Sequence, residues 1–262
     1  MVQRHEGSAF MGGAYVFPGG RVDAADLLAD TSWCDGLDHA DRQLASLSVA
    51  EARAYHVAAA RELFEEAGVL LARGLDGRFV SLADATTRDR FKQYRHDVHD
   101  DAASLRAIVE RERLRLALDA LVHFAHWVTP PIDTRQFDTR FFLARVPPEQ
   151  TPAHDQTETI HSHWIAPAAA IRLANAGEIV LPPPTWTTLR ELESFSDVES
   201  ALAWGRVRHV DRRQPLLLEQ DGRRLLLLPG DPLHPDVPEG DVPIETRFVF
   251  VERGWRAERA RT

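Results

Sequence analysis

Three glutamates lie close together in one helical segment of the sequence. Glu62, Glu65 and Glu66 stand at positions i, i+3 and i+4, so a helix would place their carboxylates on one face. Like charges gathered in this way repel one another unless water surrounds the face or a cation bridges the groups. Because these ligands are hard oxygens, a bridging cation would be Mg²⁺ or Mn²⁺ rather than zinc. The pattern alone also fits an ordinary acidic helix face in contact with water.

The helix that carries these glutamates has clear start and stop signals. Ser48 and Glu51 form a capping box, and the run 49–67 contains neither Gly nor Pro. Gly68 stands at the position of a C-terminal cap. We therefore predict a helix over 49–67.

A glycine-rich turn precedes the helix in the chain. Residues 14–17 predict a short strand that leads into Pro18-Gly19-Gly20. Glycine at such a turn permits a tight corner or the close approach of another group. Residues 24–47 look irregular, with room for one short helix.

One part of the sequence resembles the signature of the Nudix hydrolases. It consists of Gly20, Asp26 and the run Arg61-Glu62-Leu63-Phe64-Glu65-Glu66-Ala67-Gly68-Val69. That signature reads Gly, five residues, Glu, seven residues, then Arg-Glu-aliphatic-any-Glu-Glu-any-Gly-aliphatic, and every fixed position of its second half is matched. Asp26 replaces the first glutamate, and 34 residues rather than seven separate it from Arg61. Because the entropy of loop closure grows only logarithmically with loop length, this insertion need not disrupt a site.

The resemblance implies an α/β fold, an α/β/α sandwich around a mixed sheet, that hydrolyses a nucleoside diphosphate-linked substrate. Carried over by position, Glu62, Glu65 and Glu66 would bind Mg²⁺ or Mn²⁺, and the Gly20 carbonyl oxygen could add a ligand. Arg61 would orient the glutamates through charge-assisted hydrogen bonds. The metal would offset phosphate charge and help to generate hydroxide from water.

Other residues are candidates for the reaction. Glu158 lies in a polar loop that suits a general base, with a solvated loop acid as the alternative. Arg21 and Arg140 are candidates for binding the phosphates of the substrate. His123 and His126 stand at i and i+3 in an apolar segment, so a regular strand would point them to opposite faces. We expect these two histidines to be core or surface residues rather than metal ligands.

Further motifs narrow the resemblance to one subgroup. Five features of the sequence are similar to the coenzyme A diphosphatase type of Nudix protein. They are the split signature, His126-Trp127-Val128-Thr129-Pro130, residues 137–142, Trp164 and residues 181–185. This likeness implies coenzyme A or an acyl-coenzyme A as substrate, with an ADP-ribose- or NADH-type diphosphatase as the alternative. A non-catalytic module that senses a nucleotide is the competing class. Loss of the signature glutamates would mark such a module, and here all three are present.

The chain divides into a predicted Nudix domain and an extension. We assign 1–190 to the domain, with 27–50 as the insertion, and 191–262 to a C-terminal extension packed on the same domain. Only residues 1–4 precede His5-Glu6-Gly7, and they resemble the last part of a strand. We therefore also expect the chain to lack part of an initial strand. The remaining expected elements are helices over 104–118 and 167–176, strands over 121–128, 137–146 and around 163–165, and, in the extension, a helix and strands over 216–218, 225–228 and 248–251.

Composition excludes several classes of protein. The 262 residues are 44% hydrophobic and carry a net charge of −9, which argues against binding to a nucleic-acid backbone. A single cysteine, Cys34, excludes an internal disulfide and fits a reducing compartment such as the cytoplasm. No apolar run reaches the ~20 residues of a membrane span. We expect a small-molecule partner, no membrane partner, and leave open a homodimer.

Overall fold

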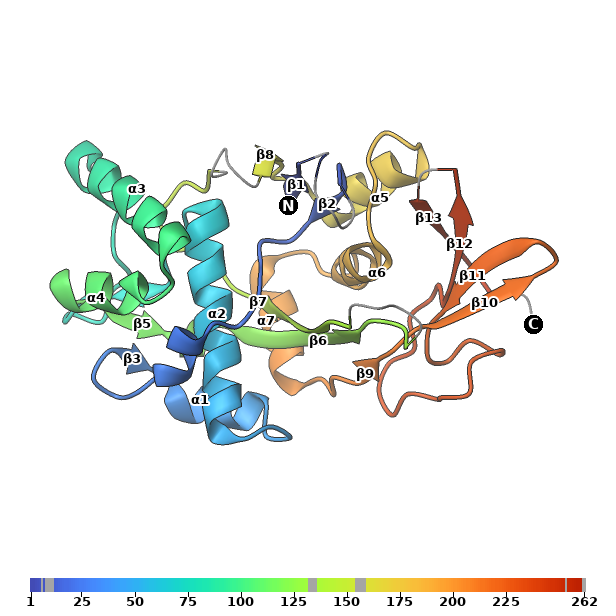
Figure 1. The fold of residues 1–262 in the computed structure, drawn as a ribbon, viewed down its shortest axis with the longest axis horizontal. Coiled ribbons are helices and arrows are strands. Elements are labelled where there is room, and N and C mark those ends of the chain that lie inside the picture. The colour runs from blue at the N-terminus through green and yellow to red at the C-terminus, as the bar shows by residue number, and fades with distance from the viewer. Residues whose placement is uncertain (6, 8–11, 132–135, 154–158, 253, 261–262) are drawn as a thin grey trace.

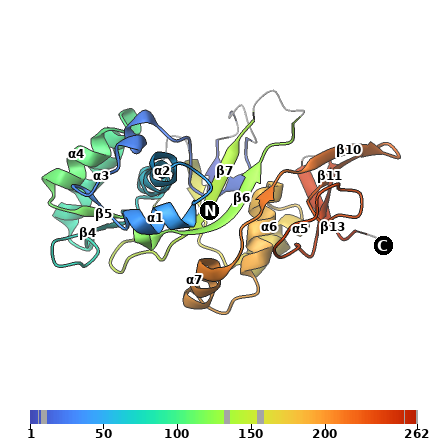
Figure 2. The same cartoon turned by 90° about the horizontal axis from the view of Figure 1, so that it is seen from below.

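The computed structural model describes residues 1–262 except 6, 8–11, 132–135, 154–158, 253 and 261–262. The long helix α2 (Val49–Ala67) crosses in front of strand β6 (Val122–Val128) in Figure 1. The C-terminal strands within 216–258 lie at the opposite end of the molecule from helices α3 (Ala85–Asp100) and α4 (Ser104–Arg111), and Figure 2 shows the same separation. Among the described residues, no helix combines the length and the apolar character needed to cross a bilayer.

The other helices surround α2 and the β6 sheet. They are η1 (Ala24–Leu28), α1 (Leu37–Gln43), α3 (Ala85–Asp100), α4 (Ser104–Arg111), η2 (Leu118–Ala120), α5 (Pro167–Asn175), α6 (Pro183–Leu192) and α7 (Val198–Val207), where η denotes a 3₁₀ helix.

The strands of the described chain form four sheets, of which two are mixed. Their orders are β2 (Tyr15–Val16), β1 (Val2–Arg4) and β8 (Thr159–Ser162); β3 (Cys34–Asp35), β5 (Arg115–Ala117) and β4 (Ala72–Arg73); β7 (Asp138–Leu143), β6 and β9 (Arg212–Arg213); and β10 (Leu216–Gln220), β11 (Arg223–Leu227), β12 (Arg247–Val251) and β13 (Gly254–Glu258). Strand β6 runs antiparallel to β7 and parallel to β9, and β5 runs parallel to β3 and antiparallel to β4. The predicted α/β fold with mixed sheets is confirmed.

Helix α2 has the bounds and caps that its sequence predicts. The Ser48 side chain accepts a hydrogen bond from the Glu51 backbone N–H, and the Glu51 carboxylate accepts one from the Ser48 N–H at 3.1 Å. Gly68 closes the helix with φ 68°, a left-handed conformation that favours glycine. These local bonds fix where the helix begins and ends, and therefore which face carries the three glutamates.

Two apolar cores hold α2 and β6 in place. The first packs α2 against the segment before it and the two helices after it, through Trp33, Leu37, Phe64, Phe91, Leu105 and Val109. The second lies between β6, the helices α5 and α6 and the C-terminal sheet, through Phe124, Ile171, Trp186, Leu226 and Phe248. The predicted insertion 27–50 is thus ordered, and it supplies buried side chains to the first core.

Several expected elements differ in the structure. The helix predicted over 104–118 ends at Arg111, because Arg113 adopts φ 55° and turns the chain into β5. The strand predicted over 137–146 covers only Asp138–Leu143, and the strand expected around 163–165 ends at Ser162. Helix α3 was not predicted at all, although Asp84 caps it.

A β-bulge also changes the faces of two histidines. In the pairing of β6 with β7, His123 faces Phe142 and Ala125 faces Phe141, so Phe124 is skipped. The extra residue brings His123 and His126 to the same face of the sheet, and the prediction of opposite faces is wrong. His123 is buried, as expected for a core histidine.

We predict that Phe64→Ala lowers the free energy of unfolding by about 3–5 kcal/mol, because Phe64 is fully buried on the side of α2 that faces the first core. Leu75→Ala is the control, since Leu75 is 83% exposed and its truncation should change stability by less than about 0.5 kcal/mol. Urea unfolding of both variants measures the difference. Equal, small losses would show that α2 does not depend on this core.

Candidate active site

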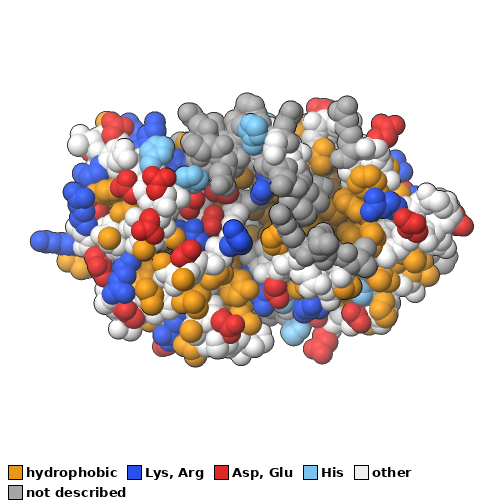
Figure 3. All heavy atoms as spheres, viewed as in Figure 1, with side chains coloured by type: hydrophobic (Ala, Val, Ile, Leu, Met, Phe, Trp, Pro, Cys, Tyr) orange, Lys and Arg blue, Asp and Glu red, His pale blue; other side chains and the backbone are white. Residues whose placement is uncertain are grey.

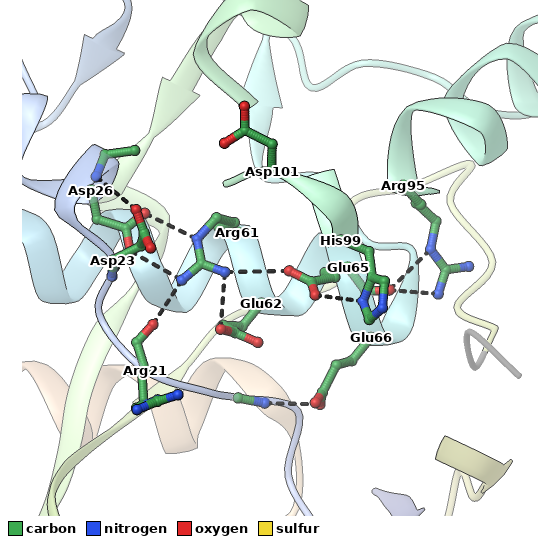
Figure 4. A network of polar contacts seen from close by, with 12 residues as sticks. Arg21, Asp23, Asp26, Arg61, Glu62, Glu65, Glu66, Arg95, His99 and Asp101 are labelled. Atoms are coloured by element: carbon green, nitrogen blue, oxygen red, sulfur yellow. Dashed lines mark hydrogen bonds and ion pairs between the residues drawn. The ribbon is translucent and has the colours of Figure 1, made fainter. Parts of the chain in front are cut away.

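The glycine corner lies directly against the acidic face of α2 (Figure 4). The Gly19 N–H donates to Glu66 Oε2 at 2.9 Å. A Cβ atom added to Gly20 would lie 2.3 Å from Glu62 Oε1, so a larger residue there would displace this carboxylate. The structure therefore brings together the corner and the glutamates that the sequence analysis placed in one site.

Arg61 holds the site together from within. Its Nη1 donates to Glu62 at 2.9 Å and to Glu65 at 3.3 Å, and its Nη2 donates to the Arg21 carbonyl oxygen at 2.8 Å. The side chain is only 5% exposed. Buried ion pairs with several hydrogen bonds fix side-chain geometry strongly. Arg61 thus holds two of the candidate metal ligands by hydrogen bonds.

Asp26 fills the position of the first signature glutamate despite its shorter side chain. Its two carboxylate oxygens accept from Arg61 Nε and Nη2, each at 3.0 Å, and the residue is 1% exposed. The Asp23 N–H donates to Asp26 Oδ2 at 2.8 Å in the capping box of η1. This 3₁₀ helix carries the carboxylate to Arg61 in spite of the long insertion between them.

Helix α3 adds two side chains that the sequence analysis missed. His99 Nδ1 lies 2.9 Å from Glu65 Oε1. Arg95 donates to the Glu65 carbonyl oxygen from Nε at 3.2 Å and from Nη2 at 2.9 Å, and also to the Ala153 carbonyl oxygen. The apolar period Phe91, Tyr94 and Val98 after the Asp84 cap was the signal that could have found this helix.

The site holds more negative than positive charge. Asp26, Glu62 and Glu65 share the single guanidinium of Arg61, and Glu62 and Glu66 are both buried. Burial raises the pKa of Glu62 to about 7, where the attraction of Arg61 opposes the shift and the repulsion of Glu65 adds to it. Figure 3 shows acidic side chains gathered over α2 and α3 on this face.

This donor set fits a hard divalent cation. Carboxylate oxygens are its preferred ligands, and a cation would offset the negative charge of the carboxylates that share the Arg61 guanidinium. In the arrangement seen here, no three acidic, histidine or cysteine side chains of the described residues enclose a metal position. Instead, Glu62 and Glu65 turn toward Arg61, and Glu66 toward the Gly19 N–H.

The remaining candidates lie in different places. The Arg21 side chain is exposed, and its backbone joins the Arg61 network. Arg140 lies on β7 outside the network drawn in Figure 4, over the ring of Tyr55 and beside Asp138. Glu158 falls outside the residues that the structure describes.

The raised pKa of Glu62 predicts a pH-dependent effect of Glu62→Gln in metal-free protein. Between the ordinary pKa of 4.5 and about 7, the folded state holds a proton at Glu62 that the unfolded state has lost. The free energy of unfolding of wild type therefore falls as pH rises through this window. Glu62→Gln removes this fall in the free energy of unfolding, because glutamine does not titrate. Urea unfolding in EDTA should therefore show that the variant gains stability relative to wild type at pH 8 but not at pH 5.

Glu219→Gln, at an exposed residue of β10, serves as the control and should behave alike at both pH values. A stability difference between Glu62→Gln and wild type that is the same at pH 5 and pH 8 would contradict the raised pKa.

Comparisons with known proteins agree with this geometry. A family model described as the NUDT19 Nudix domain matches residues 36–192. The human acyl-coenzyme A diphosphatase NUDT19 is 31% identical over 89% of this chain and 71% of its own length. The Caenorhabditis elegans putative nudix hydrolase 7 is 28% identical over 90% of this chain and 69% of its own length.

A solved structure supports the fold. The NUDIX hydrolase from Alicyclobacillus acidocaldarius superposes with a TM-score of 0.62 and 24% identity, covering 77% of this chain and 86% of that chain. The predicted membership is confirmed: the chain belongs to the NUDT19 Nudix domain family of Nudix hydrolases.

Proposed function

We propose that the protein is a Mg²⁺- or Mn²⁺-dependent diphosphatase whose substrate is coenzyme A or an acyl-coenzyme A. The observation that carries the proposal is the grouping of Glu62, Glu65 and Glu66 around Arg61 and the glycine corner, with Glu62 and Glu66 buried. The relatives named acyl-coenzyme A diphosphatase support the choice of substrate. Hydrolysis would give adenosine 3′,5′-bisphosphate and a 4′-phosphopantetheine.

Each residue of the site has a distinct part in this proposal. Glu62, Glu65, Glu66 and the Gly20 carbonyl oxygen would hold the metal, which when bound offsets phosphate charge and lowers the pKa of coordinated water. Arg61 keeps two of these carboxylates in place through the 2.9 and 3.3 Å bonds from its Nη1. The Gly19 N–H fixes the third. These bonds keep the three carboxylates beside the glycine corner, and on metal binding the carboxylates would turn from Arg61 and the Gly19 N–H toward the cation.

Hydrolysis of the diphosphate also needs a general base. The oxygen of a water molecule must attack one phosphorus while the P–O bond of the diphosphate bridge breaks. A base must accept the proton that this water loses. Glu158 is the candidate from the sequence. The chain just before it is anchored to the end of α2, because the Ala153 N–H donates to the Ala67 carbonyl oxygen at 2.9 Å. Arg95 adds a bond to the Ala153 carbonyl oxygen on the same loop.

A substrate panel tests the proposed function. Coenzyme A, acetyl-coenzyme A, ADP-ribose and NADH are each assayed with Mg²⁺ and with Mn²⁺, and the highest kcat/KM is expected for the two coenzyme A compounds. A preference for ADP-ribose or NADH would instead favour the alternative diphosphatase. Absence of turnover with every compound by folded protein would favour a nucleotide-sensing module.

We predict that Glu65→Gln lowers kcat for coenzyme A at least about 100-fold, because loss of a ligand carboxylate removes several kcal/mol of charge stabilisation. The amide keeps the shape of the side chain, so circular dichroism should be unchanged. Glu219→Gln is the control and should retain full activity, since Glu219 is exposed on β10. Wild-type activity of Glu65→Gln would remove Glu65 from the metal site.

For the general base, we predict that Glu158→Gln lowers kcat about 100-fold or more at neutral pH and removes the acidic limb of the pH–rate profile. The measurement is kcat against pH from 5 to 9 with saturating metal. Near wild-type turnover at all pH values would exclude Glu158 from proton transfer.

A further inference from the structure

Three basic side chains stand in one row across the sheet formed by β7, β6 and β9. Arg140 on β7 and Arg212 on β9 are the register partners of His126 on β6. Residues opposite one another in neighbouring strands point to the same face of a sheet, so the three side chains project together. Asp138, two residues before Arg140, is on this face as well. We call Arg140, His126 and Arg212 the basic row.

The charge of the basic row is only partly balanced. Asp138 Oδ1 lies 2.9 Å from His126 Nε2 and pairs with Arg140. Arg212 donates to the neutral side chain of Gln214 at 2.9 Å, and among the described residues no carboxylate pairs with Arg212.

The histidine of the row does not add to this charge at neutral pH. Burial lowers the pKa of His126 to about 4, with Arg140 and Arg212 adding to the shift. Burial and the charge of Arg212 also lower the pKa of Arg140, although nearby Tyr55 opposes this. Two guanidinium groups therefore face one carboxylate, in a chain whose net charge is −9.

The basic row borders the same side of α2 as the candidate metal ligands. The guanidinium of Arg140 lies 4.9 Å from the centre of the Tyr55 ring. Tyr55, Glu62 and Glu66 stand at i, i+7 and i+11 on α2, so they share one face of the helix. Seven residues correspond to about 10 Å along a helix axis. A positive site thus lies about two helical turns from the acidic one.

From this arrangement we infer that the basic row binds the 3′-phosphate of a coenzyme A-type substrate while the diphosphate lies at the glutamates; the inference rests on the proposed function. Such a substrate carries two anionic groups separated by one ribose, and only one of them can occupy the metal site. Arginine forks recognise phosphate oxygens through paired charge-assisted hydrogen bonds. The neutral imidazole of His126 has a single N–H, and its Nε2 faces Asp138 at 2.9 Å, so the two arginines supply the hydrogen bonds to the phosphate.

The inference gives the C-terminal extension a direct part in binding. Strand β9 comes from the chain beyond residue 190, yet it pairs with β6 at the centre of the sheet. Arg212 therefore reaches the substrate side of the sheet only because the extension returns to it. If the inference holds, the extension contributes to the selection of substrates that carry a 3′-phosphate, through Arg212.

Steady-state kinetics with coenzyme A and 3′-dephospho-coenzyme A test the basic row. Arg212→Gln should raise KM for coenzyme A about tenfold, the factor expected for one lost charge-assisted bond. It should raise KM for 3′-dephospho-coenzyme A less than twofold. Arg206→Gln is the matched control, because Arg206 is exposed on α7, and it should leave both KM values unchanged. Equal changes of KM for both substrates in Arg212→Gln, or no change, would overturn the inference.

Calorimetric binding of products without metal gives an independent reading. Wild type should bind adenosine 3′,5′-bisphosphate at least about tenfold more tightly than AMP, and Arg212→Gln should lose most of this preference. Equal affinity of wild type for the two nucleotides, or an unchanged preference in the variant, would overturn the inference. Wild type that cleaves neither coenzyme A compound would overturn the proposed function instead, and the binding comparison would still decide the role of the row.

Discussion

The buried guanidinium of Arg61 is the constraint on which the site depends. It contacts Asp26, Glu62 and Glu65 at 2.9–3.3 Å and is itself only 5% exposed. Removing one partner of a buried ion pair leaves an uncompensated charge, which costs several kcal/mol. One positive charge cannot balance three carboxylates, so the fold keeps an acidic centre that a divalent cation would complete. On the proposed function, the folding of the chain would thus prepare the site for a metal ion.

Two segments outside α2 maintain this arrangement. The segment before α2 packs Trp33 and Leu37 into the first core and carries Asp26 to Arg61 on a short 3₁₀ helix. Helix α3 packs on the other side, where Arg95 bonds the Glu65 carbonyl oxygen and His99 contacts the Glu65 carboxylate. The long insertion therefore does not loosen the signature. Its cost in closure entropy is offset by the apolar surface that it buries.

The part of the site that could be predicted from sequence is the part encoded locally. The bounds of α2 follow from the Ser48 capping box and Gly68, and the spacing of the glutamates follows from the helix period. Features that depend on distant contacts were missed or wrong. The left-handed Arg113 ends α4 early, and the bulge at Phe124 is visible only in the pairing with β7. Helix α3 has weak amphipathic character, and its role appears only where Arg95 meets the end of α2.

Arg61 and Arg212 differ in how far protein groups balance their charge, and this difference distinguishes an arginine that positions glutamates from one that can bind phosphate. Arg61 is saturated by protein carboxylates and by the Arg21 carbonyl oxygen, so it has no donor left for a substrate phosphate. Arg212 donates its described hydrogen bond to the neutral amide of Gln214, which does not balance the positive charge of the guanidinium. If the two kinds of arginine lay side by side, the acidic cluster would neutralise the basic row and neither could bind its own ligand. About two turns of α2 keep them apart, and on the two proposals this separation would allow one face to hold a cation and an anion together.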